Sequence, residues 1–182
     1  MDRDSLVEAG LGLISRFGSR ALSLTQVASH AGVARATAYR MFGGRSALMN
    51  AIVDRELVLL REKFIAWGAD EPDPARRVHI RVTSALGYIR DHGALQYVLR
   101  HEPEEVSRSL ISVGVDDGPT LVERIVETVL PELTTEEAQA LRPNPRGAIE
   151  FMVRTIMSSM VVPQSSLTDD AIADLVVRAV TD

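Results

Sequence analysis

Two arginines and a tyrosine near the N-terminus have the chemistry and the spacing to contact DNA. Arg35, Tyr39 and Arg40 fall on one side of a short predicted helix. Ala38 and Phe42 fall on the opposite side, where they would face a core. A guanidinium can bind O6 and N7 of guanine with two hydrogen bonds, or it can bind a phosphate. The sequence leaves both roles open for each arginine.

The elements that would position these side chains are two short helices and a tight turn. Ser23, followed by Gln26, has the form of a capping box and predicts a helix from Leu24. Gly32 favours the positive φ that ends a helix and turns the chain. The second helix covers residues 34–42. A helix-turn-helix unit of this kind places its second helix in the DNA major groove.

The segment GVARATAYRMFGGRSALM, residues 32–49, resembles the recognition segment of the TetR family of ligand-controlled transcription repressors. The resemblance also includes LTQVA at residues 24–28. It implies phosphate contacts for Thr37 and Tyr39, although Tyr39 could instead pack against the preceding helix. Thr25 is a further phosphate candidate, Arg45 stands at a helix N-terminus that suits a phosphate, and Ala36 could meet a thymine methyl. The predicted DNA contacts are Thr25, Arg35, Ala36, Thr37, Tyr39, Arg40 and Arg45.

The charge distribution supports contact with DNA at one end of the chain. The 182 residues carry a net charge of −5. Residues 1–46 contain six arginines and three acidic residues, whereas the remainder contains 14 basic and 22 acidic residues. The N-terminal part is therefore net positive and the rest net negative, which suits a DNA-binding head on an acidic body.

Helical periodicity continues to the C-terminus without a convincing strand pattern. We predict an all-α protein with two domains: a three-helix DNA-binding domain at residues 1–46 and a helical ligand-binding and dimerisation domain at residues 47–182. The predicted helices cover residues 4–17, 24–31, 34–42, 46–67, 74–92, 94–101, 103–111, 120–130, 135–141, 146–162 and 168–180, and a turn is predicted at residues 116–119.

The last two predicted helices are candidates for a subunit interface. The helix at residues 146–162 is apolar on more than one side, so it is either buried in its own core or shared with a partner. The family resemblance implies that this helix and the one at 168–180 form a four-helix bundle in a homodimer. A two-fold symmetric dimer would bind a near-palindromic double-stranded operator.

The resemblance also implies an unknown small-molecule effector that binds the body and weakens DNA binding. Aromatic, histidine and methionine residues at helical spacing could line its pocket, although packing in the core is the more common role of such residues. The pocket candidates are Trp67, Tyr88, His92, Tyr97, His101, Phe151 and Met152.

The sequence contains no pattern typical of a metal site, a cofactor site or an enzyme active site. There are no cysteines, the histidine spacing matches no metal site, and no nucleophile–base pair or phosphate loop is present, so we expect no cofactor, no metal and no enzymatic activity. Without a predicted membrane span or signal peptide, a cytoplasmic location is expected. Two alternatives remain: a helical small-molecule-binding protein or enzyme with a vestigial helix-turn-helix, and a regulator released by a partner protein. Activation instead of repression also stays open.

Overall fold

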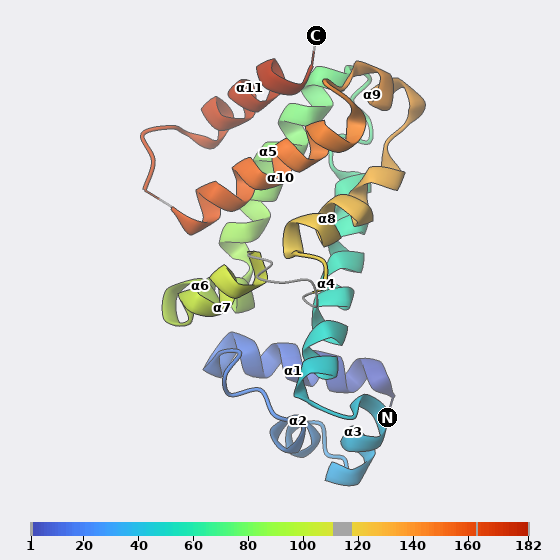
Figure 1. Ribbon diagram of the computed structural model, residues 1–182, viewed down its shortest axis with the longest axis vertical. Coiled ribbons are helices and arrows are strands. Elements are labelled where there is room, and N and C mark those ends of the chain that lie inside the picture. The colour runs from blue at the N-terminus through green and yellow to red at the C-terminus, as the bar shows by residue number, and fades with distance from the viewer. Residues whose placement is uncertain (1, 111–117, 163, 182) are drawn as a thin grey trace. The chain divides into compact units, whose positions relative to one another are not determined.

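A computed structural model describes residues 2–110, 118–162 and 164–181 (Figure 1). Every regular element in these ranges is a helix, so the all-α prediction is confirmed. Part of the turn predicted at residues 116–119 lies outside the described residues. The helices are α1 Arg3–Phe17, α2 Leu24–His30, α3 Arg35–Phe42, α4 Arg45–Ala66, α5 Pro74–Asp91, α6 Gly93–His101, α7 Pro103–Leu110, α8 Leu121–Val129, a 3-10 turn Leu130–Glu132, α9 Thr135–Ala140, α10 Pro145–Val161 and α11 Asp169–Val180.

The chain divides into two compact units. Unit 1 contains residues 1–58 and 92–108, and unit 2 contains residues 59–91 and 109–182. The predicted division after residue 46 separates the DNA-binding motif from the rest of the sequence. The compact unit that holds this motif is larger, because it also includes the first part of α4, all of α6 and most of α7.

The core of unit 1 joins α1, α2, α3 and the first turns of α4. Leu6, Val27 and Leu48 are almost completely buried there. Ala38 and Phe42 of α3 are also buried, at 0% and 8% exposure, which confirms their predicted inward orientation. Burial of one face of α3 leaves the opposite face available to a ligand.

Local signals in the sequence account for the short helices of unit 1. The Ser23 hydroxyl accepts a hydrogen bond from Gln26 N at 3.2 Å and so caps α2. Gly32 has φ +68° and turns the chain between α2 and α3. Ala34 precedes α3 and supplies no side-chain cap, as its residue type predicts. The start of α3 therefore has weaker local support than the start of α2.

Unit 2 is a helical bundle in which α5 packs against α9, α10 and α11, and α10 packs against α8 and α11. Val82 of α5, Ile149 of α10 and Val176 of α11 are almost fully buried. Phe151 of α10 and Leu175 of α11 are, by contrast, 46% and 51% exposed. The two C-terminal helices thus combine a buried face with exposed large apolar side chains.

Candidate nucleic-acid interface

The outward face of α3 carries the side chains predicted to contact DNA. Arg35, Ala36 and Arg40 are exposed, and Tyr39 is 41% exposed. Thr37 is half-buried on the same helix, and Thr25 is exposed in the first turn of α2. This arrangement makes guanidinium, hydroxyl and methyl groups accessible from solvent, as major-groove binding requires.

Tyr39 and Arg35 support each other on this face. The Arg35 guanidinium carbon lies 5.0 Å from the centre of the Tyr39 ring, and Arg35 Nη2 lies 3.5 Å from the Tyr39 hydroxyl. The two residues are four apart in the helix, the spacing at which side chains meet. A cation–π contact of this kind restricts the conformations of the Arg35 side chain, which would reduce the entropy lost if Arg35 binds a ligand.

Arg45 lies at the N-terminus of α4, as predicted, and its side chain also forms hydrogen bonds within the protein. Its Nη2 donates to the carbonyl of Ser19 at 2.8 Å, and its Nε donates to the carbonyl of Leu22 at 3.1 Å. Both acceptors lie in the turn between α1 and α2. Arg45 therefore holds this turn against the start of α4, a role that the sequence analysis did not anticipate.

A buried carboxylate holds the same turn by its amide groups. Glu102, which follows α6, is 5% exposed and accepts hydrogen bonds from Ser19 N at 2.7 Å and Arg20 N at 3.0 Å. Burial would raise the pKa of Glu102, but hydrogen bonds from Ser19 and Arg20 outweigh it and hold that pKa below its usual value. The Arg20 side chain forms a salt bridge with Glu104 nearby.

Arg3 adds a cation close to the recognition helix. Its guanidinium carbon lies 5.2 Å from the centre of the Phe42 ring at the end of α3. Neither Arg3 nor Glu102 was among the site residues predicted from sequence. Their partners are 39 and more than 80 positions away in the chain, so no local spacing could have identified the contacts.

Comparison with known proteins places the motif in a family. Residues 6–52 match the family model described as bacterial regulatory proteins, tetR family. A helix-turn-helix-type transcriptional regulator of Mycobacterium tuberculosis is 33% identical over a match that covers 72% of each chain. The chain belongs to the TetR family. It is a DNA-binding transcriptional regulator, and its relatives are regulators and not enzymes.

Solved structures of TetR-family proteins share the fold. The repressor AlkX from Dietzia sp. strain DQ12-45-1b superposes with a TM-score of 0.67 at 22% identity, covering 98% of this chain and 92% of AlkX. RolR in complex with resorcinol superposes with a TM-score of 0.64 at 14% identity, covering 98% of this chain and 86% of RolR. Because each superposition covers 98% of this chain, the shared fold includes both compact units.

The predicted effector-pocket residues of this TetR-family chain are divided between the two units. His92, Tyr97 and His101 belong to unit 1, and Trp67, Tyr88, Phe151 and Met152 belong to unit 2. Several of them already have contacts: His92 Nε2 lies 2.7 Å from a Glu56 oxygen, and the Trp67 and Tyr88 rings meet edge to face at 6.1 Å. Phe151 is exposed on α10. A shared pocket for all seven stays a prediction.

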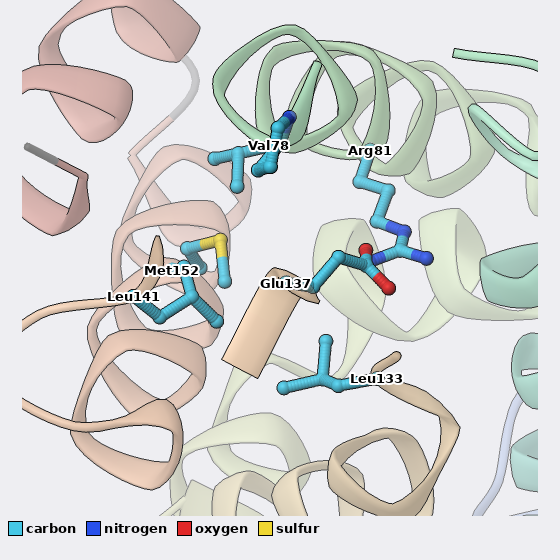
Figure 2. Close-up of a pocket in the computed structure, with 7 residues that line it drawn as sticks. Val78, Arg81, Leu133, Glu137, Leu141 and Met152 are labelled. Carbon is cyan, nitrogen blue, oxygen red and sulfur yellow. The ribbon is translucent and has the colours of Figure 1, made fainter. Parts of the chain in front are cut away.

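A small cavity in unit 2 lies between α5, α9 and α10, and Figure 2 shows the side chains around it. Its volume of about 10 Å³ is close to that needed for one water molecule. Met152 is the predicted pocket residue that reaches it. The lining residues are Pro74, Val78, Arg81, Leu133, Glu137, Leu141 and Met152.

Charged groups close one side of this cavity. Arg81 forms a buried salt bridge with Glu137, and the Arg81 guanidinium carbon lies 3.9 Å from the centre of the Phe64 ring. Arg77 Nη1 lies 3.3 Å from the other Glu137 oxygen. Burial lowers the pKa of Arg81, and the Glu137 charge partly offsets this effect. The cluster fixes α9 to α5, and the space left is too small for an organic effector.

Proposed function

We propose that this regulator binds a near-palindromic DNA operator as a homodimer and represses transcription until a small-molecule effector binds. The single observation that carries the DNA-contact part is the exposure of Arg35, Tyr39 and Arg40 on α3 while Ala38 and Phe42 are buried. This face has the side chains and the accessibility that major-groove reading requires.

Arg35 and Arg40 are the proposed base-reading residues, and Ala36 is a proposed contact to a thymine methyl. A bidentate contact between arginine and guanine discriminates against other bases by about 1–3 kcal/mol. Phosphate contacts are proposed for Thr25, Thr37, Tyr39 and Arg45, which together would fix the register of the helix on the duplex. Tyr39 would bind a phosphate and would also orient Arg35 for base reading, since the Arg35 guanidinium lies over its ring.

The proposed dimer forms through α10 and α11. Phe151, Val161 and Leu175 are exposed large apolar residues on these helices, and pairing with a second copy would remove them from water. A two-fold symmetric pair presents two recognition helices to successive major grooves, about 34 Å apart on one face of the duplex. The operator should therefore consist of two inverted half-sites.

A small molecule that binds the helical body is the proposed signal that releases this regulator from DNA. This role is supported by the solved complex of the TetR-fold protein RolR with resorcinol. An effector that prefers the conformation with displaced recognition helices needs a coupling free energy of about 1–3 kcal/mol to change DNA affinity about 5–150-fold. The expected location of such a regulator is the cytoplasm.

Selection of bound duplexes from a random DNA library tests the proposal directly. An enriched inverted repeat is expected, and a sedimentation measurement should give two chains per bound duplex. Arg40→Ala should weaken binding to the selected duplex at least tenfold, whereas Arg16→Ala, an exposed arginine of α1, should change it by less than about threefold. Equal effects of the two substitutions on DNA affinity would show that Arg40 does not contact the bases.

A further inference from the structure

The turn between α1 and α2 is held from both sides by charged side chains that are distant in sequence. Arg45 binds the carbonyl oxygens of Ser19 and Leu22, and Glu102 binds the amide groups of Ser19 and Arg20. The peptide groups of this turn therefore have little freedom to rotate. The turn continues directly into Ser23, the residue that caps α2, so its orientation sets the direction in which α2 and α3 leave α1.

The Glu102 carboxylate approaches the backbone of Gly18 closely. Gly18 has φ +84°, and a Cβ atom at this position would lie 2.4 Å from Glu102 Oε1 and 2.9 Å from Tyr97 Cε1. Glycine is thus required both by the backbone conformation and by the close approach of the carboxylate. Since the α6–α7 junction supplies Glu102, the contact attaches the N-terminal motif to residues 92–108 of the same compact unit.

We propose that Glu102 is a positioning residue for DNA recognition, which orients α2 and α3 by binding the amide groups of the α1–α2 turn. Glu102 touches no DNA in this scheme. It opposes Arg45 across one turn, so that the reading face of α3 is presented in a single orientation. The proposal rests on the DNA-contact face described above, and the experiment is arranged so that the two can fail separately.

The direction in which DNA affinity changes when the Glu102 charge is removed distinguishes a positioning role from simple charge repulsion between Glu102 and DNA. Removing an acidic residue from unit 1, the compact unit that holds the DNA-binding motif, should by itself strengthen binding to the phosphate backbone. Glu102→Gln keeps the size of the side chain but replaces one acceptor oxygen with an NH2 group, which cannot accept from an amide. Positioning therefore predicts weaker binding, about tenfold or more, which corresponds to the loss of one charge-assisted hydrogen bond.

Glu104→Gln is the matched control. It removes the same charge two residues away and breaks the salt bridge with Arg20. The two hydrogen bonds from the backbone amides of Ser19 and Arg20 to Glu102 remain in place. Both variants are compared with the natural chain for affinity to the selected duplex, at a temperature where circular dichroism shows all three folded. Glu104→Gln should bind as tightly as the natural chain or more tightly. If Glu102→Gln does the same, the proposal is overturned.

A spectroscopic readout distinguishes positioning from a loss of stability. The chain contains no cysteine, so spin labels at Met41→Cys on α3 and Arg100→Cys on α6 report one distance within unit 1 when labelled chains are diluted with unlabelled ones. Without DNA, Glu102→Gln should broaden or shift this distance distribution, and Glu104→Gln should not. An unchanged distribution in Glu102→Gln would contradict the proposal.

Two further variants keep the result interpretable. If Glu102→Gln fails to fold, Glu102→Asp replaces it, because the shorter carboxylate keeps the charge but cannot reach both amides in the same pose; a natural affinity and distance distribution in this variant would overturn the proposal. Arg40→Ala is measured in parallel. If Arg40→Ala binds normally while Glu102→Gln broadens the distances, the proposed DNA-facing residues are wrong and the positioning role stands.

Discussion

Glu102 in unit 1 and Glu137 in unit 2 are both buried glutamates, but they stabilise their surroundings in different ways. Glu102 is 5% exposed and accepts hydrogen bonds from the amides of a turn. Glu137 is 4% exposed and faces two guanidinium groups, those of Arg77 and Arg81. The first carboxylate positions backbone, whereas the second neutralises buried side-chain charge.

The difference follows from where each carboxylate sits. Glu137 is the third residue of α9 and completes a capping box with Thr134, so a local helix signal already places it correctly. Glu102 follows α6 and meets residues more than 80 positions earlier in the chain. Both carboxylates bind partners that are distant in sequence, but Glu137 binds side chains of α5, whereas Glu102 binds the backbone of the turn that leads into α2.

Glu137→Ala should have the largest effect on stability of the changes considered. It leaves the Arg81 guanidinium buried without its carboxylate, and breaking a buried ion pair in this way typically costs about 3–5 kcal/mol. Urea unfolding followed by circular dichroism measures the loss. Glu136→Ala is the control, because Glu136 is an exposed acidic residue in the same helical turn and should contribute about 1 kcal/mol or less. Similar losses in both variants would mean that the buried pair contributes little.

Two glycines test the close contact at Glu102. Gly18→Ala and Gly32→Ala both place a side chain at positive φ, at +84° and +68°, which costs about 1–2 kcal/mol. Only Gly18→Ala also drives a Cβ into the Glu102 carboxyl group, since nothing lies within 4 Å of a Cβ at Gly32. Gly18→Ala should therefore be more destabilising by about 1–3 kcal/mol in urea unfolding. Equal costs would show that the contact relaxes easily.

The positions of the helices could be predicted closely because their boundaries carry local signals. Ser23 caps α2, Gly43 ends α3 with φ +73°, and Pro74 begins α5. The outward orientation of Arg35 and Arg40 followed from the same helical periodicity. These features depend on neighbours within about four residues, which is the range over which sequence patterns are informative.

Long-range contacts could not be predicted from those patterns. Arg45 was predicted to bind a phosphate from the residue type and its place at a helix start, and its bonds to Ser19 and Leu22 came only from the folded chain. Glu102 was not distinguished from the many exposed acidic residues of the body. Its burial, and therefore its role, depends on how α6 packs against α1.

The pH dependence of stability should reveal the Glu102 contact. Its pKa is lower in the folded chain than in the unfolded chain, so its contribution is complete above the ordinary glutamate pKa of about 4.3 and is lost as the pH falls through the lower folded value. Glu102→Gln should flatten the decline in unfolding free energy below about pH 4.3 relative to the natural chain. Glu104→Gln is the control for loss of one acidic residue outside this contact. If the unfolding free energies of the natural chain and Glu102→Gln fall in parallel as the pH is lowered, the stabilising role of the Glu102 carboxylate is contradicted.

Ala34→Ser should give the smallest effect, and it is a gain. α2 and α9 begin with hydroxyl caps from Ser23 and Thr134, whereas α3 begins after Ala34, whose extended backbone would allow a serine to cap it. A cap of this kind contributes about 0.5–2 kcal/mol. We expect slower hydrogen exchange at the first amides of α3 and a higher unfolding free energy. Ala47→Ser, exposed in the first turn of α4, should give no gain. If Ala34→Ser also gives none, the free amides of α3 are already satisfied by water, and the recognition helix needs no cap beyond its contacts with the core.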